Sequence, residues 1–131
     1  LLSNEGLDDY RDSIQSWWDT SNEYIRQLGV TPYQNFLVIT HDESVVPHKH
    51  GDHMGDTITV VVVVGTNVVD NKLILGDNVI DYPPADEQCY AVCFDGDILH
   101  ATQCNDKNVY FHFVYDIIDK VDIKKNTWIK L

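Results

Sequence analysis

Histidines and aspartates gather in one short stretch of the sequence, VVPHKHGDHMGD at residues 45–56. Imidazole and carboxylate groups bind Fe(II) in mononuclear sites that keep open positions for an oxidant and a co-substrate. His48 and His50 are two residues apart, so their side chains point to one face if the chain is extended there. Asp52 follows His50 at the same spacing and offers a second possible pair. The stretch therefore predicts one half of a metal site.

A second histidine element lies further along the chain, in FDGDILHATQCN at residues 94–105. There His100 follows a turn and begins a predicted strand. A strand histidine that faces the interior of a small barrel could complete a jelly-roll metal site with the earlier cluster. The predicted ligands are therefore His48, His50 or Asp52, and His100. The other interpretation is a solvated loop at the first cluster and an ordinary hydrogen-bonded core histidine at the second.

Short β-strands are the elements that would position these residues. From Asn35 onward, runs rich in β-branched and apolar residues alternate with turn signals such as Gly-Asp-Asn and Pro-Pro. Strands at this spacing, with no helix among them, predict an all-β sandwich or barrel. The runs are NFLVIT, SVVPHKH, TITVVVVVG, NKLIL, NVIDY, CYAVCF, ILHATQ, NVYFHFVYD and TWIK.

Residues 6–28 have a different pattern, with apolar residues three and four positions apart. This spacing predicts one amphipathic helix that ends at Gly29. With 131 residues, 44% of them hydrophobic, the chain is long enough for one core and predicts a single domain. The helix should brace the outside of a β-barrel formed by residues 35–131. The side chains expected against the sheet are Leu7, Ile14, Trp17 and Leu28.

Composition excludes several classes of partner. The formal net charge is −12, and no basic face is visible for a nucleic acid or an anionic membrane. No apolar stretch is long enough to span a bilayer, and no secretion signal is expected. Cys89, Cys93 and Cys104 are odd in number and lack CxxC spacing, which favours reduced thiols in the cytoplasm. A small-molecule or peptide substrate is expected, and a cationic one would be attracted more readily than an anion.

The two histidine elements together resemble the aspartyl/asparaginyl β-hydroxylase branch of the Fe(II)/2-oxoglutarate-dependent oxygenases. The resemblance covers about residues 37–118 and rests on three motifs. They are Pro47-His48, the Phe-Asp-x4-His element that ends at His100, and residues 114–116, Val-Tyr-Asp, where the family has a closing Val-Asp pair. The resemblance implies a double-stranded β-helix, a jelly-roll or cupin-like barrel. It also implies Fe(II) and 2-oxoglutarate as cofactors, with His48 and His100 as iron ligands.

One position departs from the family. The family binds the distal carboxylate of 2-oxoglutarate with an arginine ten residues after the distal histidine, and this chain has Tyr110 there. An arginine fork holds a carboxylate through two parallel hydrogen bonds. Lys72 is predicted on an interior strand face, where it could replace the arginine as a point charge. Tyr110 and His112 share a face predicted to point inward, where they could bind a co-substrate or form a buried hydrogen-bonded pair.

Three functions therefore fit the sequence. The first is an Fe(II)- and 2-oxoglutarate-dependent oxygenase. The second is a cupin-like three-histidine metalloprotein that does not use 2-oxoglutarate, although cupins usually have a proline before the glycine that corresponds to Gly96. The third is a non-catalytic jelly-roll binding module that has lost its co-substrate. Metal analysis separates the third from the first two, and a titration with 2-oxoglutarate separates the first from the second.

Overall fold

One helix and nine strands make up the described part of the computed structural model. The described residues are 10–32, 34–41, 45–48, 57–66, 71–96, 98–103, 109–118 and 123–131. The elements are α2 (Arg11–Gln27), β1 (Gln34–His41), β2 (Val45–His48), β3 (Thr57–Gly65), β4 (Lys72–Leu75), β5 (Asn78–Asp81), β6 (Tyr90–Asp95), β7 (His100–Gln103), β8 (Val109–Ile118) and β9 (Ile129–Lys130). Each predicted strand run overlaps one of these strands, with bounds that differ by up to two residues at an end. No helix within these ranges has the length and apolar character needed to cross a membrane.

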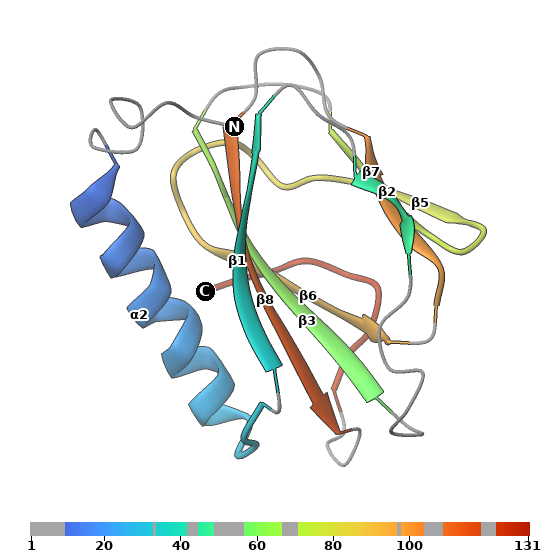
Figure 1. The fold of residues 1–131 in the computed structure, drawn as a ribbon, viewed down its shortest axis with the longest axis horizontal. Helices are drawn as coiled ribbons and strands as arrows, with labels where there is room; N and C mark the ends of the chain where they lie inside the picture. The colour runs from blue at the N-terminus through green and yellow to red at the C-terminus, as the bar shows by residue number, and fades with distance from the viewer. Residues whose placement is uncertain are drawn as a thin grey trace.

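The strand order identifies the fold. The larger sheet has the order β1-β8-β3-β6-β9 and the smaller sheet β2-β7-β4-β5 (Figure 1). All strand pairs are antiparallel. The chain moves from one sheet to the other at every connection from β1 to β8 except the β4–β5 hairpin. Eight strands wound in this way form a jelly roll, the double-stranded β-helix. The predicted fold class is therefore confirmed.

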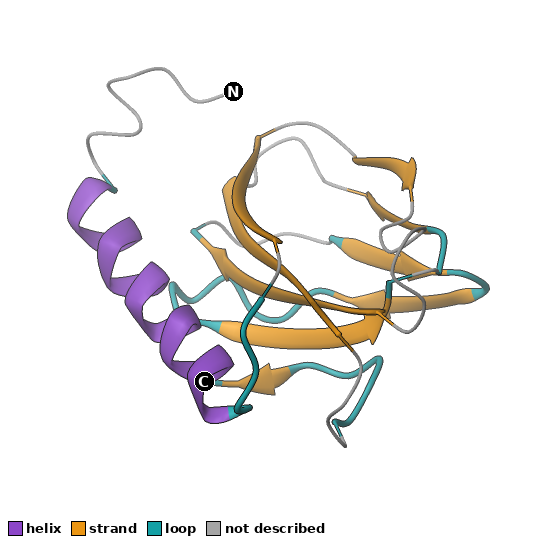
Figure 2. Cartoon of the chain, turned by 60° about the horizontal axis from the view of Figure 1, so that its bottom comes forward, coloured by secondary structure: helices purple, strands orange, loops and turns teal. Residues whose placement is uncertain are grey.

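Helix α2 packs against the outer face of the larger sheet, beside the strands rather than between the sheets (Figure 2). Its buried residues Trp17 and Ile25 join a cluster with alternate residues of β3 and β8. Ile14 and Leu28 are partly buried against the same cluster. The helix ends before Gly29, whose φ of 74° is a left-handed conformation that glycine adopts without strain. The predicted brace is confirmed for these residues, and Leu7 lies outside the described part of the chain.

A second apolar cluster fills the space between the two sheets. Its buried members come from β4 and β6, and partly buried side chains from β3, the β5 end and the C-terminal segment pack against them. Strand side chains alternate between faces, so β3, β6 and β8 each contribute one set of residues to the α2 side and the other to the barrel. The buried members are Leu73, Leu75, Val92 and Phe94.

Two cysteines are buried in the helix–sheet region, Cys89 and Cys93, and both are free thiols. Burial raises the pKa of each thiol to about 11. The hydroxyl of Tyr24 lies 3.9 Å from the Cys93 sulfur. Cys104 lies outside the described residues. The reduced state predicted for Cys89 and Cys93 agrees with these contacts.

These two thiols should be unreactive in the native protein at pH 8. Their raised pKa keeps them protonated until the pH approaches 11, and the thiolate is the form that reacts. A Cys104→Ser background leaves Cys89 and Cys93 as the thiols to be followed. A chromogenic disulfide reagent should then release its colour slowly from native protein and rapidly from protein unfolded in urea. Prompt reaction of two equivalents in the native protein would contradict this packing.

Candidate metal centre

The pairing of β2 with β7 brings two of the predicted ligand positions together. β2 ends at His48, β7 begins at His100, and the two residues are direct partners in the antiparallel register. Residues directly opposite in such a pair lie on the same face of the sheet. The register shifts between Val45 and His48, as at a β-bulge, and bulges are frequent beside active sites. The sequence elements predicted to form one site therefore meet at one pair of strands.

The His100 ring is oriented by two contacts. Its Nδ1 lies 3.0 Å from the carbonyl oxygen of Ile98, and its ring centroid lies 4.7 Å from that of Phe94. A carbonyl can only accept, so Nδ1 carries the hydrogen and the neutral ring has its lone pair on Nε2. Metal-binding histidines usually donate their other N–H to a carbonyl or carboxylate in this way. The side chain is buried, at 6% exposed, so the tautomer and the burial both suit a metal ligand.

A row of inward-facing residues crosses the larger sheet at the level of His100. Phe94, which contacts the His100 ring, is the register partner of Thr59, and Thr59 is the partner of Asp116. The Thr59 hydroxyl donates a 2.8 Å hydrogen bond to Asp116 Oδ1. Thr59 is 0% exposed and Asp116 is 2% exposed. The barrel thus holds a buried carboxylate on the strand row that leads to His100.

His112 faces the barrel, as predicted, but its hydrogen-bond partner was not predicted. The hydroxyl of Tyr82 lies 2.9 Å from His112 Nε2, and the two rings meet edge to face. Tyr82 also packs against Trp128, with ring centroids 5.4 Å apart. For Tyr110 the structure describes the backbone, which pairs with Thr40 and Gly65. The structure thus places the partly buried Tyr82 against His112. The predicted pair of Tyr110 with His112 stays a prediction, because the Tyr110 side chain lies outside the described part of the chain.

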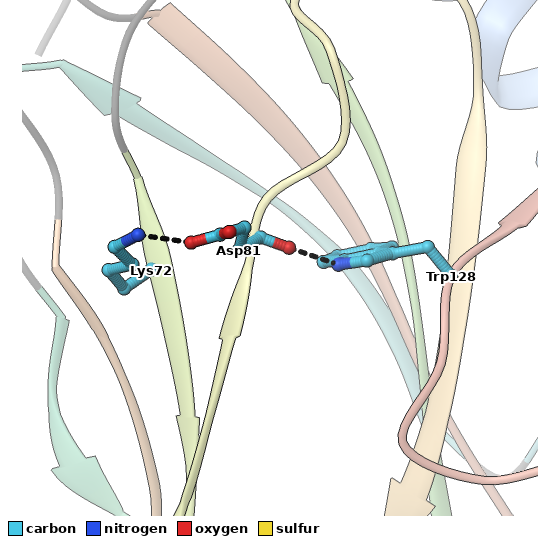
Figure 3. A network of polar contacts seen from close by, with 3 residues as sticks. All are labelled: Lys72, Asp81 and Trp128. Atoms are coloured by element: carbon cyan, nitrogen blue, oxygen red, sulfur yellow. Dashed lines mark hydrogen bonds and ion pairs between the residues drawn. The ribbon is translucent and has the colours of Figure 1, made fainter.

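The prediction that Lys72 faces the barrel interior is wrong. Lys72 pairs with Asp81 across the β4–β5 hairpin, and their side chains form an ion pair (Figure 3). The two side chains are 40% and 76% exposed. Leu73 and Leu75 occupy the inward face of β4, so alternation directs Lys72 outward. The indole of Trp128 donates a 2.8 Å hydrogen bond to the Asp81 carbonyl, and Figure 3 shows Asp81 between Lys72 and Trp128.

Two of the predicted ligands, His50 and Asp52, lie outside the described residues, as does the side chain of His48. Among the residues that the structure describes, no three His, Cys, Asp or Glu side chains are close enough together to hold a metal ion. The register of β2 and β7 thus supports the pairing of positions 48 and 100. The choice between His50 and Asp52 stays a prediction.

No protein-family model and no curated protein matches this chain. Among solved structures, the chain is similar to a prolyl-4-hydroxylase from Pseudomonas putida, with a TM-score of 0.48 and 17% sequence identity. The superposition covers 77% of this chain and 63% of that chain, so this chain spans less than two thirds of that protein. The fold assignment given above rests on the strand order of this chain itself.

Proposed function

We propose that the protein is an Fe(II)-dependent oxygenase that hydroxylates a C–H bond of a small-molecule or peptide substrate, with 2-oxoglutarate as co-substrate. The observation that carries this proposal is the direct register pairing of His48 with His100 in a jelly-roll barrel. His100 adds a buried ring whose Nδ1–H is committed to a backbone carbonyl. The geometry of the pair and the tautomer together favour a metal ligand over a surface histidine.

The donor set suits Fe(II). His48 and His100 would bind the metal with His50 or Asp52, which gives three imidazoles or two imidazoles and a carboxylate. Either set leaves coordination positions for the co-substrate and dioxygen, and bound Fe(II) supplies the oxidation chemistry. The protein's own residues hold and shield the site. Phe94 packs on the His100 ring, and the apolar side chains between the sheets exclude water from that end of the barrel.

The described residues are less suited to bind 2-oxoglutarate than to bind a metal ion. No Lys or Arg side chain of the described residues faces the barrel, because Lys72 lies on the outer face. Among the side chains that the structure describes, the basic groups inside the barrel are His100 and His112, and His112 has a hydrogen bond to Tyr82. We assign the distal carboxylate of 2-oxoglutarate to His112 and to the neighbouring inward position, Tyr110. A histidine cannot form the two parallel hydrogen bonds that a guanidinium makes with a carboxylate. The affinity for 2-oxoglutarate should therefore be weak.

Anaerobic calorimetric titration of 2-oxoglutarate into the Mn(II)-loaded protein tests this assignment. The wild type should bind weakly, and Lys72→Ala should bind equally well because its side chain points away from the barrel. His112→Gln keeps a hydrogen-bonding group for Tyr82 but removes the basic ring. It should weaken binding by about 10- to 100-fold, because a charge-assisted hydrogen bond contributes roughly 1.5–3 kcal/mol. A loss of binding in Lys72→Ala would contradict the outward placement of that residue.

A second function is favoured by the same absence of a described interior lysine or arginine. The protein would then be a cupin-like three-histidine metalloprotein that does not use 2-oxoglutarate, with His48, His50 and His100 as ligands. The titration distinguishes the two. Wild-type protein that binds Mn(II) but shows no heat with 2-oxoglutarate would favour this second function. Protein that binds neither would favour the non-catalytic binding module.

A further inference from the structure

A groove on the outside of the molecule lies between the second half of α2 and strand β9, away from the residues assigned to the metal and the co-substrate. Its volume is about 570 Å³. Figures 1 and 2 both show the C-terminal end of the chain beside α2. We propose that this groove binds an extended, basic segment of a partner protein, which adds to the free edge of β9 as a further strand of the larger sheet.

The main chain of β9 offers hydrogen bonds at this edge. β9 is the last strand of the larger sheet, and among the described residues no strand pairs with its other side. The Leu131 N–H donates a 3.0 Å hydrogen bond to the Cys89 carbonyl of β6's side of the ladder. In an antiparallel pair, hydrogen-bonded and non-hydrogen-bonded residues alternate. Lys130, the next residue back and the partner of Tyr90, therefore directs its N–H and C=O away from β6, toward the open edge.

Apolar side chains flank this edge on the side of α2. Ile129 is the register partner of Ala91, which belongs to the cluster beneath α2, and Leu131 packs against the same cluster. Strand side chains alternate, so the Lys130 side chain points to the opposite face and its main chain faces the groove. Ile129, Leu131 and Tyr24 all line the groove. They would pack against alternate side chains of an added strand, as in other cases of strand addition.

Two carboxylates on the helical wall of the groove select the charge of the partner. Asp19 and Glu23 both line it, and their four-residue spacing puts them on one face of α2. Gln15 donates a 3.0 Å hydrogen bond to Asp19 Oδ1, and Glu23 forms a 3.1 Å ion pair with Arg26 in which both side chains are more than half exposed. Such an exposed ion pair is weak, so Glu23 can also bind a cation of the partner. The formal net charge of −12 attracts a basic segment from a distance.

The probe is a dye-labelled, amidated peptide, Thr-Lys-Val-Lys-Val-Lys, whose fluorescence anisotropy is followed as the full chain is added. It should bind, and its affinity should fall as the salt concentration rises. The same peptide with Glu in place of Lys should not bind. A third peptide, N-methylated at alternate amides, keeps the charge but loses the hydrogen bonds of a strand, and should bind at least about tenfold more weakly. Equal binding of the methylated peptide would show that the groove recognises charge alone, and would overturn the inference.

Lys130→Pro tests the edge itself. Proline has no N–H, and the Lys130 N–H points away from β6, so the variant should fold while its peptide affinity falls at least about tenfold. Lys130→Ala is the matched control and should bind like the wild type. Asp19→Asn combined with Glu23→Gln should weaken binding by about fivefold, because exposed ion pairs are individually weak. Asp12→Asn removes an exposed carboxylate of the same helix that does not line the groove, and should have no effect.

Wild-type protein that does not bind the basic peptide, or a folded Lys130→Pro protein that binds it normally, would overturn the inference. If Lys130→Pro fails to fold, the methylated peptide and the carboxylate variants decide the outcome. A dimer that forms without peptide and is disrupted by the carboxylate variants would assign the groove to a second copy of this chain instead. Metal-free and Mn(II)-loaded protein should bind the peptide equally, so the result is independent of the proposed function.

Discussion

The His100→Ala variant is expected to lose stoichiometric metal binding. His100 supplies one of the two imidazoles that the β2–β7 register places opposite one another, and its Nδ1–H is already held by the Ile98 carbonyl. Loss of a ligand should cost more than the roughly 10- to 100-fold that outer groups contribute, so Mn(II) affinity should fall by more than about a hundredfold. Calorimetry and the metal content after dialysis measure the effect.

Thr102→Val provides the control on the same strand. Thr102 is another buried residue on the inward face of β7, but its side chain is not among the predicted ligands. The variant should retain wild-type metal content. If His100→Ala also retains it while folding normally, the assignment of the metal to this pair of strands is wrong.

The second large effect concerns the helix that covers the outer face of the sheet. Trp17 is 8% exposed, and its ring lies 5.3 Å from that of Phe111 on β8. Replacing a buried tryptophan with alanine costs about 3–5 kcal/mol, because it removes apolar contacts and leaves a cavity. Domains of this size are stable by only about 5–15 kcal/mol. Trp17→Ala should therefore lose much of the free energy of unfolding, measured by urea denaturation.

The neighbouring residue is the control for this prediction. Trp18 is half-buried and packs edge to face on Phe113, with ring centroids 5.0 Å apart. Trp18→Ala should destabilise the protein less than Trp17→Ala. Both variants should keep the wild-type metal affinity at temperatures where they are folded, because α2 packs outside the barrel. A Trp17→Ala protein with unchanged urea midpoint would contradict the role of the helix as a brace.

Local sequence patterns were sufficient to predict the elements. Each strand run is bounded by turn residues, and the three- and four-residue spacing in residues 6–28 is typical of a helix that packs on one side. The pairing of His48 with His100 could also be predicted from the sequence. A histidine at the end of one strand and another at the start of a later strand meet in a jelly roll, where the second and seventh strands are neighbours.

The orientation of Lys72 could not be derived in the same way. The run NKLIL has three consecutive apolar residues, so alternation alone does not decide which residues face the barrel. In the structure, Leu75 pairs with His100, and this pairing puts Leu73 and Leu75 on the inward face of β4. Lys72 then lies outside, beside its cross-strand partner Asp81.

The polar contacts inside the barrel depend on registers between segments far apart in the sequence. Tyr82 follows β5 and precedes Pro83-Pro84, where the local pattern indicates a turn and gives no sign of a bond to His112. Thr59 and Asp116 are register partners only because β3 and β8 pair along their full length. Sequence periodicity specifies which face a residue occupies but not its partner across the sheet.

We propose that one divalent metal binds where β2 meets β7. The most direct measurement is an anomalous-difference map from crystals grown anaerobically with Mn(II), with data collected at wavelengths on either side of the manganese edge. We expect one strong peak per chain within bonding distance of the imidazoles of His48 and His100. A strong peak elsewhere, with none at these histidines, would show that β2 and β7 do not form the metal site.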